Sequence, residues 1–111
     1  MKFIITKNKL NNVALTWMNK NFSPDQLEVV TSEKYPGSIF FRKDGFVVME
    51  QDKKYKDFWF DYDVIWSFFE SVFGMEYEQV QEVLSYWLDD TFKLKGFTAL
   101  PSSITLSLKA G

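Results

Sequence analysis

The stretch SIFFRKDGFVVME, Ser38–Glu50, decides the fold, because two apolar runs flank the dipeptide Asp44-Gly45. An Asp-Gly pair between apolar runs is typical of a two-residue turn that joins neighbouring antiparallel strands. The sequence therefore predicts a β-hairpin over these residues, with one strand on each side of the turn.

Extended segments flank this hairpin on both sides. Upstream, Leu27–Thr31 is rich in β-branched residues and alternates in polarity, which predicts a strand. Downstream, Tyr55–Asp61 places Phe58 and Phe60 on one face of an extended chain. Together with the hairpin, these segments predict an antiparallel β-meander of three to four strands.

Helical patterns precede and follow the predicted meander. Residues 7–21 carry apolar side chains at the i, i+3, i+4 spacing of an amphipathic helix. Two later stripes have the same period and end near Gly74 and Gly96, residues that terminate helices well. The later stripes comprise Val64, Ile65, Phe68, Phe69, Val72 and Phe73, and then Val80, Val83, Leu84, Trp87, Leu88 and Phe92.

This order of elements predicts an α+β fold, with an N-terminal helix, the antiparallel meander, and two amphipathic helices packed on one face of the sheet. The length of 111 residues suits one domain, which we place at residues 1–96. Residues 97–111 alternate in polarity around Pro101 and are expected to form an extended segment or a tail.

The composition combines 21 aromatic residues with a complete absence of histidine and cysteine. These two absent types are the usual neutral-pH base and the strongest nucleophile, so we expect no enzyme activity and no cofactor. Asp57, Asp61 and Asp63 cluster near the start of the second helical stripe, where helix capping is a better interpretation than metal binding. We therefore predict neither catalytic residues nor a metal site.

The charge is divided along the chain. Residues 1–56 carry ten basic and six acidic residues, a net charge of +4, whereas residues 57–111 carry three and nine, a net charge of −6. Such asymmetry can mark a nucleic-acid face or a partner face, although surface charges also segregate by chance along a short chain. No apolar run approaches the ~20 residues of a membrane-spanning helix, and the N-terminus lacks a signal-peptide core, so we expect an intracellular protein without membrane contact.

Two surfaces are candidates for binding. The preferred one is a protein-binding surface, because Trp and Tyr that lie off an apolar stripe are common interface hot spots and an acidic helix face attracts basic partners. Its predicted residues are Trp66, Tyr86, Glu78, Glu82 and Asp89. Binding to a partner protein or to a second copy of the chain is then expected.

The alternative is a nucleic-acid surface built on the basic hairpin loop and the polar segment after it. Lysines attract phosphates, and an interleaved tyrosine can stack on bases. The residues of this alternative are Lys43, Lys53, Lys54 and Tyr55. The overall acidity of the chain makes it the weaker of the two, because nucleic-acid-binding domains usually carry a basic footprint.

Two parts of the chain resemble small uncharacterised proteins of large tailed bacteriophages. They are the opening Lys2–Thr6, which leads directly into a helix, and the aromatic stretch Ile65–Phe73, followed by Tyr77, Val80 and Trp87. That resemblance implies a viral origin, in the host cytoplasm or in the virion, and brings no assigned activity or functional residue with it. We therefore expect a non-enzymatic phage accessory or virion-associated protein that acts by protein–protein interaction.

Overall fold

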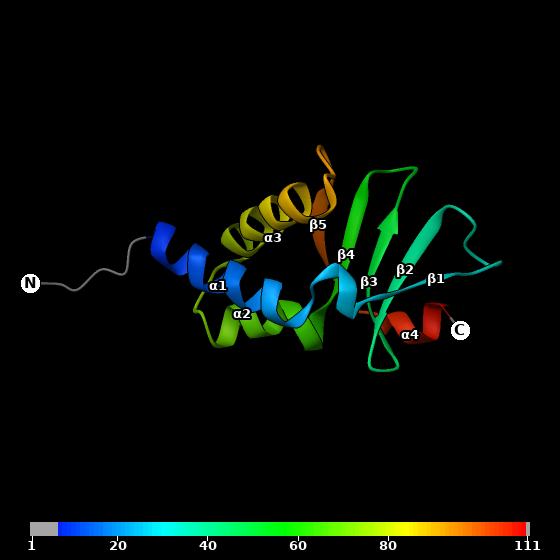
Figure 1. Ribbon diagram of the computed structural model, residues 1–111, viewed down its shortest axis with the longest axis horizontal. Helices are drawn as coiled ribbons and strands as arrows, with labels where there is room; N and C mark the ends of the chain where they lie inside the picture. Colours follow the sequence, from blue (N-terminus) through cyan, green and yellow to red (C-terminus); the bar gives the residue numbers. More distant parts are fainter. Residues whose placement is uncertain (1–6, 111) are drawn as a thin grey trace, which may run out of the picture.

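The computed structural model describes residues 7–110, and within them it shows an α+β fold in which a five-stranded sheet packs against helices (Figure 1). The opening Lys2–Thr6 lies outside the described residues. In chain order the elements are α1 (Lys7–Asn21), the 3₁₀ turn η1 (Pro24–Gln26), β1 (Glu28–Thr31), β2 (Ser38–Lys43), β3 (Phe46–Asp52), β4 (Asp57–Asp61), the π-helical turn η2 (Tyr62–Trp66), α2 (Ser67–Ser71), α3 (Tyr77–Phe92), β5 (Thr98–Ser102) and α4 (Leu106–Ala110).

The sheet has the strand order β1-β2-β3-β4-β5. The first four strands are antiparallel neighbours, so the predicted hairpin and meander are confirmed. Asp44 and Gly45 have positive φ values of 51° and 88°, as the turns favoured in two-residue hairpins require. The prediction of a purely antiparallel sheet is wrong, because β5 is a fifth strand and runs parallel to β4.

The parallel strand follows from the chain path between Asp61 and Thr98. Parallel neighbours need a crossover of a dozen or more residues, and η2, α2 and α3 supply it here. The sequence pattern predicts that residues 97–111 form an extended segment or tail outside the domain. In the structure, Thr98–Ser102 form β5 of the sheet and Leu106–Ala110 form α4 on its surface.

A β-bulge in the central hairpin decides which side chains of β3 face each side of the sheet. The register shifts between Phe41 and Arg42, which pair with Met49 and Val47, so Val48 is the additional residue. Val48 and Met49 both enter the large core under α1, α2 and α3, whereas Val47 faces the opposite side. We call these two sides the inner face and the outer face.

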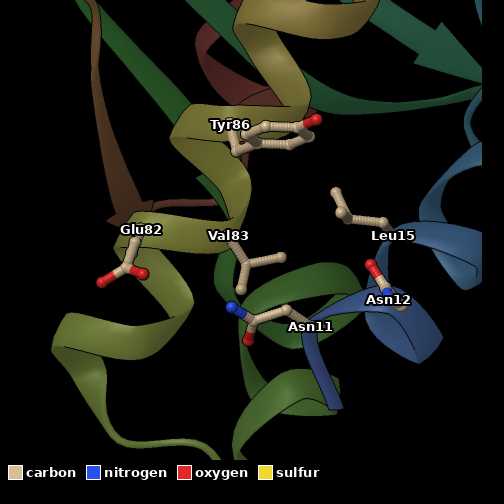
Figure 2. Close-up of a pocket in the computed structure, with 6 residues that line it drawn as sticks. All are labelled: Asn11, Asn12, Leu15, Glu82, Val83 and Tyr86. Carbon is tan, nitrogen blue, oxygen red and sulfur yellow. The ribbon is translucent and has the colours of Figure 1, made fainter. Parts of the chain in front are cut away.

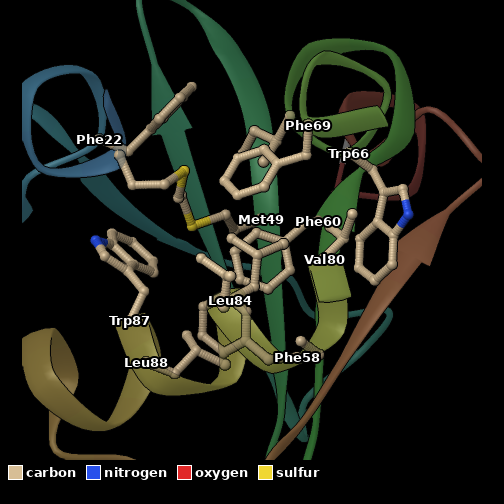
Figure 3. Packing of buried hydrophobic residues seen from close by; sticks show 14 of the residues in the cluster. Phe22, Met49, Phe58, Phe60, Trp66, Phe69, Val80, Leu84, Trp87 and Leu88 are labelled. Carbon is tan, nitrogen blue, oxygen red and sulfur yellow. The ribbon is translucent and has the colours of Figure 1, made fainter. Parts of the chain in front are cut away.

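The inner face carries the main core, which is strongly aromatic (Figure 3). Phe69 of α2 and Trp87 of α3 are buried in it, in agreement with their central place on the predicted stripes. The ring of Phe60 on β4 lies 6.2 Å from that of Trp87 in an edge-on arrangement. Trp17 of α1 stacks on Phe68 of α2 at 4.2 Å, so this aromatic pair packs α1 against α2.

α4 packs on part of the outer face, so the helices do not all lie on one face of the sheet (Figure 1). Leu106 packs on Phe40 and Val47 in a small second core. Glu50 is only 1% exposed, yet its carboxylate accepts hydrogen bonds from Lys109 Nζ at 2.8 and 3.0 Å and from Ser38 Oγ at 2.6 Å. A short helix is marginal alone, so these contacts hold α4 in place.

Candidate protein-binding surface

The long helix α3 separates its side chains into a buried face and an exposed acidic face. Val80, Leu84 and Trp87 enter the inner core. The opposite side carries four residues that are spaced four, four and three positions apart in the sequence. Residues at these spacings lie above one another on one side of a helix. We call this side the acidic α3 surface, and it consists of Glu78, Glu82, Tyr86 and Asp89.

Tyr86 is the large apolar residue of this surface, with 59% of the side chain exposed. It lies beside a groove of about 450 Å³ between α1 and α3. Figure 2 shows Val83 and Tyr86 on α3 facing Leu15 and Asn12 on α1, with Glu82 along the same helix. The remaining residue that lines the groove is Asn11.

The walls of the groove are held by side-chain hydrogen bonds between the two helices. Gln79 Nε2 donates to Asn11 Oδ1 at 3.1 Å, and Trp87 Nε1 donates to Asn19 Oδ1 at 2.9 Å. Both bonds span 68 residues of sequence. The groove is therefore a preformed feature of the fold, and a ligand does not have to create it.

A second hollow, of about 320 Å³, lies on the other side of Tyr86 toward the end of α3. It is lined by Tyr86, Asp89, Asp90, Lys93 and Lys95. The tyrosine ring is thus a ridge between two hollows, with carboxylates on both sides. An exposed aromatic ridge among polar groups has the form of an interface hot spot and its polar rim.

Trp66, the other aromatic residue of the predicted surface, is 0% exposed, so it is not available to a partner. Its ring packs on Tyr77 at 5.2 Å between centroids. The cause is η2, whose π-helical turn holds more residues per turn than an α-helix and rotates the stripe. As a result Trp66 turns inward, whereas Val64 is 44% exposed.

The residues of the nucleic-acid alternative are not brought together. Lys43 Nζ donates to the backbone carbonyl of Asn21 and lies 4.7 Å from the ring centre of Phe22. Lys53 and Lys54 belong to the turn between β3 and β4, at the other end of β3 (Figure 1). A strand of seven residues is roughly 20 Å long, so these lysines do not form one patch with Lys43.

The turn from β3 to β4 still exposes Tyr55, which is 67% accessible. Lys54 Nζ lies 5.3 Å from the centre of its ring. The side chain of Asp52 accepts hydrogen bonds from the amides of Lys54 and Tyr55, which gives the turn a defined shape. Of the predicted residues, Lys53, Lys54 and Tyr55 thus remain together on this turn, which also carries Lys56.

Of the aspartates near the end of β4, Asp61 has a structural role. Asp61 is buried and accepts a hydrogen bond from the amide of Val64 at 3.0 Å, which caps η2 as predicted. Nearby, the hydrogen bond that the Tyr62 hydroxyl donates to Glu70, together with the negative charge of Glu70, raises the pKa of Tyr62 above its ordinary value. Within residues 7–110, no group of three or more acidic side chains is placed to hold a metal ion.

No protein-family model matches this chain, and the comparisons with curated proteins and with solved structures found no match either. Among the described helices, none combines the length and the apolar character needed to cross a bilayer.

Proposed function

We propose that this protein is a non-enzymatic binding protein that recognises a basic protein partner through the acidic α3 surface. The observation that carries the proposal is the position of Tyr86, an exposed aromatic ridge between two hollows with carboxylates on either side. Tyrosine supplies a large contact area at low entropic cost, and surrounding charges select a partner and accelerate its association.

The charge pattern of the surface supports a basic partner in particular. Glu78 and Glu82 are four residues apart on α3, so their carboxylates lie on the same side of the helix. A lysine or arginine of a partner would be attracted to this negative charge. Asp89 extends the negative charge past Tyr86 by almost one further helical turn, so an elongated basic segment fits the surface better than one isolated cation.

We further propose, from the phage resemblance alone, that the protein is a phage accessory or virion-associated protein acting in the host cytoplasm or in the virion. The nucleic-acid alternative is reduced to the turn that holds Lys53, Lys54 and Tyr55. We retain this alternative because Tyr55 is exposed beside a lysine, an arrangement that allows the ring to stack on a base.

The test is affinity capture from expressing cells with two charge-reversed variants. The acidic variant carries Glu78→Lys, Glu82→Lys and Asp89→Lys, and the basic variant carries Lys53→Glu and Lys54→Glu. Lys43 is left intact because its ammonium group is bound within the fold. Each capture is repeated after nuclease treatment, which removes partners that are bridged by nucleic acid.

We expect the acidic variant to lose the partner protein that the wild type retains after nuclease treatment, with unchanged circular dichroism. Exposed charges contribute little to stability, so the fold should survive both sets of substitutions. Loss of the partner in the basic variant alone, together with loss after nuclease, would replace this proposal by the nucleic-acid alternative. That alternative also predicts a steep fall in affinity as the salt concentration rises.

A further inference from the structure

The two edge strands of the sheet, β1 and β5, differ in whether their outward backbone groups are available for pairing, and those of β5 are protected. The amide of Thr98 donates to the carbonyl of Lys56 at 2.9 Å, so the backbone groups of Thr98 point toward β4. Backbone groups of successive strand residues point to opposite sides, which directs those of Ala99 and Pro101 outward. Gln81 Nε2 of α3 donates to the Ala99 carbonyl at 3.0 Å, and Pro101 has no N–H to offer.

The β1 edge has neither protection. Apart from its ladder with β2, no hydrogen bond within residues 7–110 reaches a backbone group of Glu28–Thr31. The strand contains no proline, and Val29 is 61% exposed although it lies opposite the buried Phe41 of β2. An edge strand with free backbone groups and an exposed apolar side chain is a template for another strand.

We propose that β1 pairs in antiparallel fashion with β1 of a second copy of this chain, around a two-fold axis at Val29. The axis runs perpendicular to the sheet, so side chains directly opposite each other lie on the same face. Val29 then meets Val29 of the second copy on the inner face, and each covers the other's exposed surface. The two sheets become one continuous sheet.

The sequence of β1 is compatible with antiparallel pairing to β1 of a second copy. With the axis at Val29, Glu28 lies opposite Val30 of the second copy and Leu27 lies opposite Thr31, so no two like charges face each other. Glu28 already forms a salt bridge with Arg42 of its own chain, which offsets its negative charge at the edge. A strand of four residues buries little area, so the dimer is expected to be weak and concentration-dependent.

Sedimentation velocity over rising protein concentration tests the dimer. Val29→Lys places a charge on the edge and should raise the dimer dissociation constant at least tenfold. The matched control is Val13→Lys on α1, because Val13 is 50% exposed and lies away from the sheet. It should leave the dimer unchanged, and circular dichroism should show both variants folded.

The register is tested in single-cysteine variants, which the absence of native cysteine allows. With a short thiol-to-thiol cross-linker, Val29→Cys should give a covalent dimer in much higher yield than Val13→Cys. A wild type that stays monomeric up to millimolar concentration would overturn the proposal. A dimer that resists Val29→Lys, or that cross-links equally at both positions, would overturn it as well. None of these variants alters the acidic α3 surface, so the two proposals fail independently.

Discussion

A helix and a pair of hairpins place their charged residues differently, as the acidic α3 surface and the basic residues of the hairpins show. On α3, residues three and four apart fall on one line, so Glu78, Glu82 and Asp89 stay together around Tyr86. In the meander, consecutive turns lie at opposite ends of the strands, which separates Lys43 from Lys53. Proximity in sequence therefore indicates a shared surface on a helix, but not across a hairpin.

The largest loss of stability is expected on the buried face of α3, the helix that carries the acidic α3 surface. Trp87→Ala should destabilise the protein by about 3–5 kcal/mol, because Trp87 is buried against Phe60 and bonded to Asn19. Its neighbour Tyr86 is exposed, and Tyr86→Ala should stay within about 0.5 kcal/mol. Urea denaturation measures both, and equal losses would show that the two faces of α3 are wrongly assigned.

A smaller loss of stability is expected at Lys109, whose partner Glu50 is a buried carboxylate that belongs to neither candidate binding surface. Lys109→Ala leaves the carboxylate of Glu50 buried without its cation, which should cost about 2–3 kcal/mol because Lys109 itself is partly exposed. Lys95→Ala, at an exposed lysine after α3, serves as the control and should have little effect. Thermal melting of both variants gives the answer, and an unchanged midpoint for Lys109→Ala would argue against the docking of α4.

Smaller losses of stability are expected for variants of two lysines in the hairpins, Lys43 and Lys54. Lys43 donates to the Asn21 carbonyl and lies on Phe22, so Lys43→Ala should lower the free energy of unfolding by about 1–2 kcal/mol. Lys54 lies on an exposed turn, and Lys54→Ala should stay within about 0.5 kcal/mol. If chemical denaturation shows the reverse order, Lys43 is the free cation and the basic surface must be reconsidered.

Elements with local signals were predictable, because each carries its own pattern. The Asp44-Gly45 turn specifies the central hairpin, and the stripe through Val83 and Trp87 specifies the buried face of α3. The same stripe identifies Tyr86 as the exposed aromatic residue of that helix. These parts of the fold and of the candidate site depend on neighbours in sequence.

The remaining elements depend on contacts between distant residues. β5 pairs with β4 only after the crossover through α3, and Pro101 weakens its local strand signal. α4 has five residues and is held by Leu106 and Lys109 against the outer face. The prediction that Trp66 is exposed is wrong because the local pattern carries no signal for the π-helical turn that rotates this side chain inward.

The most direct measurement of the central claim compares two exposed tyrosines, one on each candidate surface. Tyr86 is 59% exposed on the acidic α3 surface, and Tyr55 is 67% exposed on the basic turn. Each is replaced in turn by the photo-cross-linking residue benzoylphenylalanine, and the cells are irradiated before purification. We predict a protein adduct from position 86 and none from position 55. Nucleic-acid adducts from position 55, with no adduct from position 86, would contradict the account.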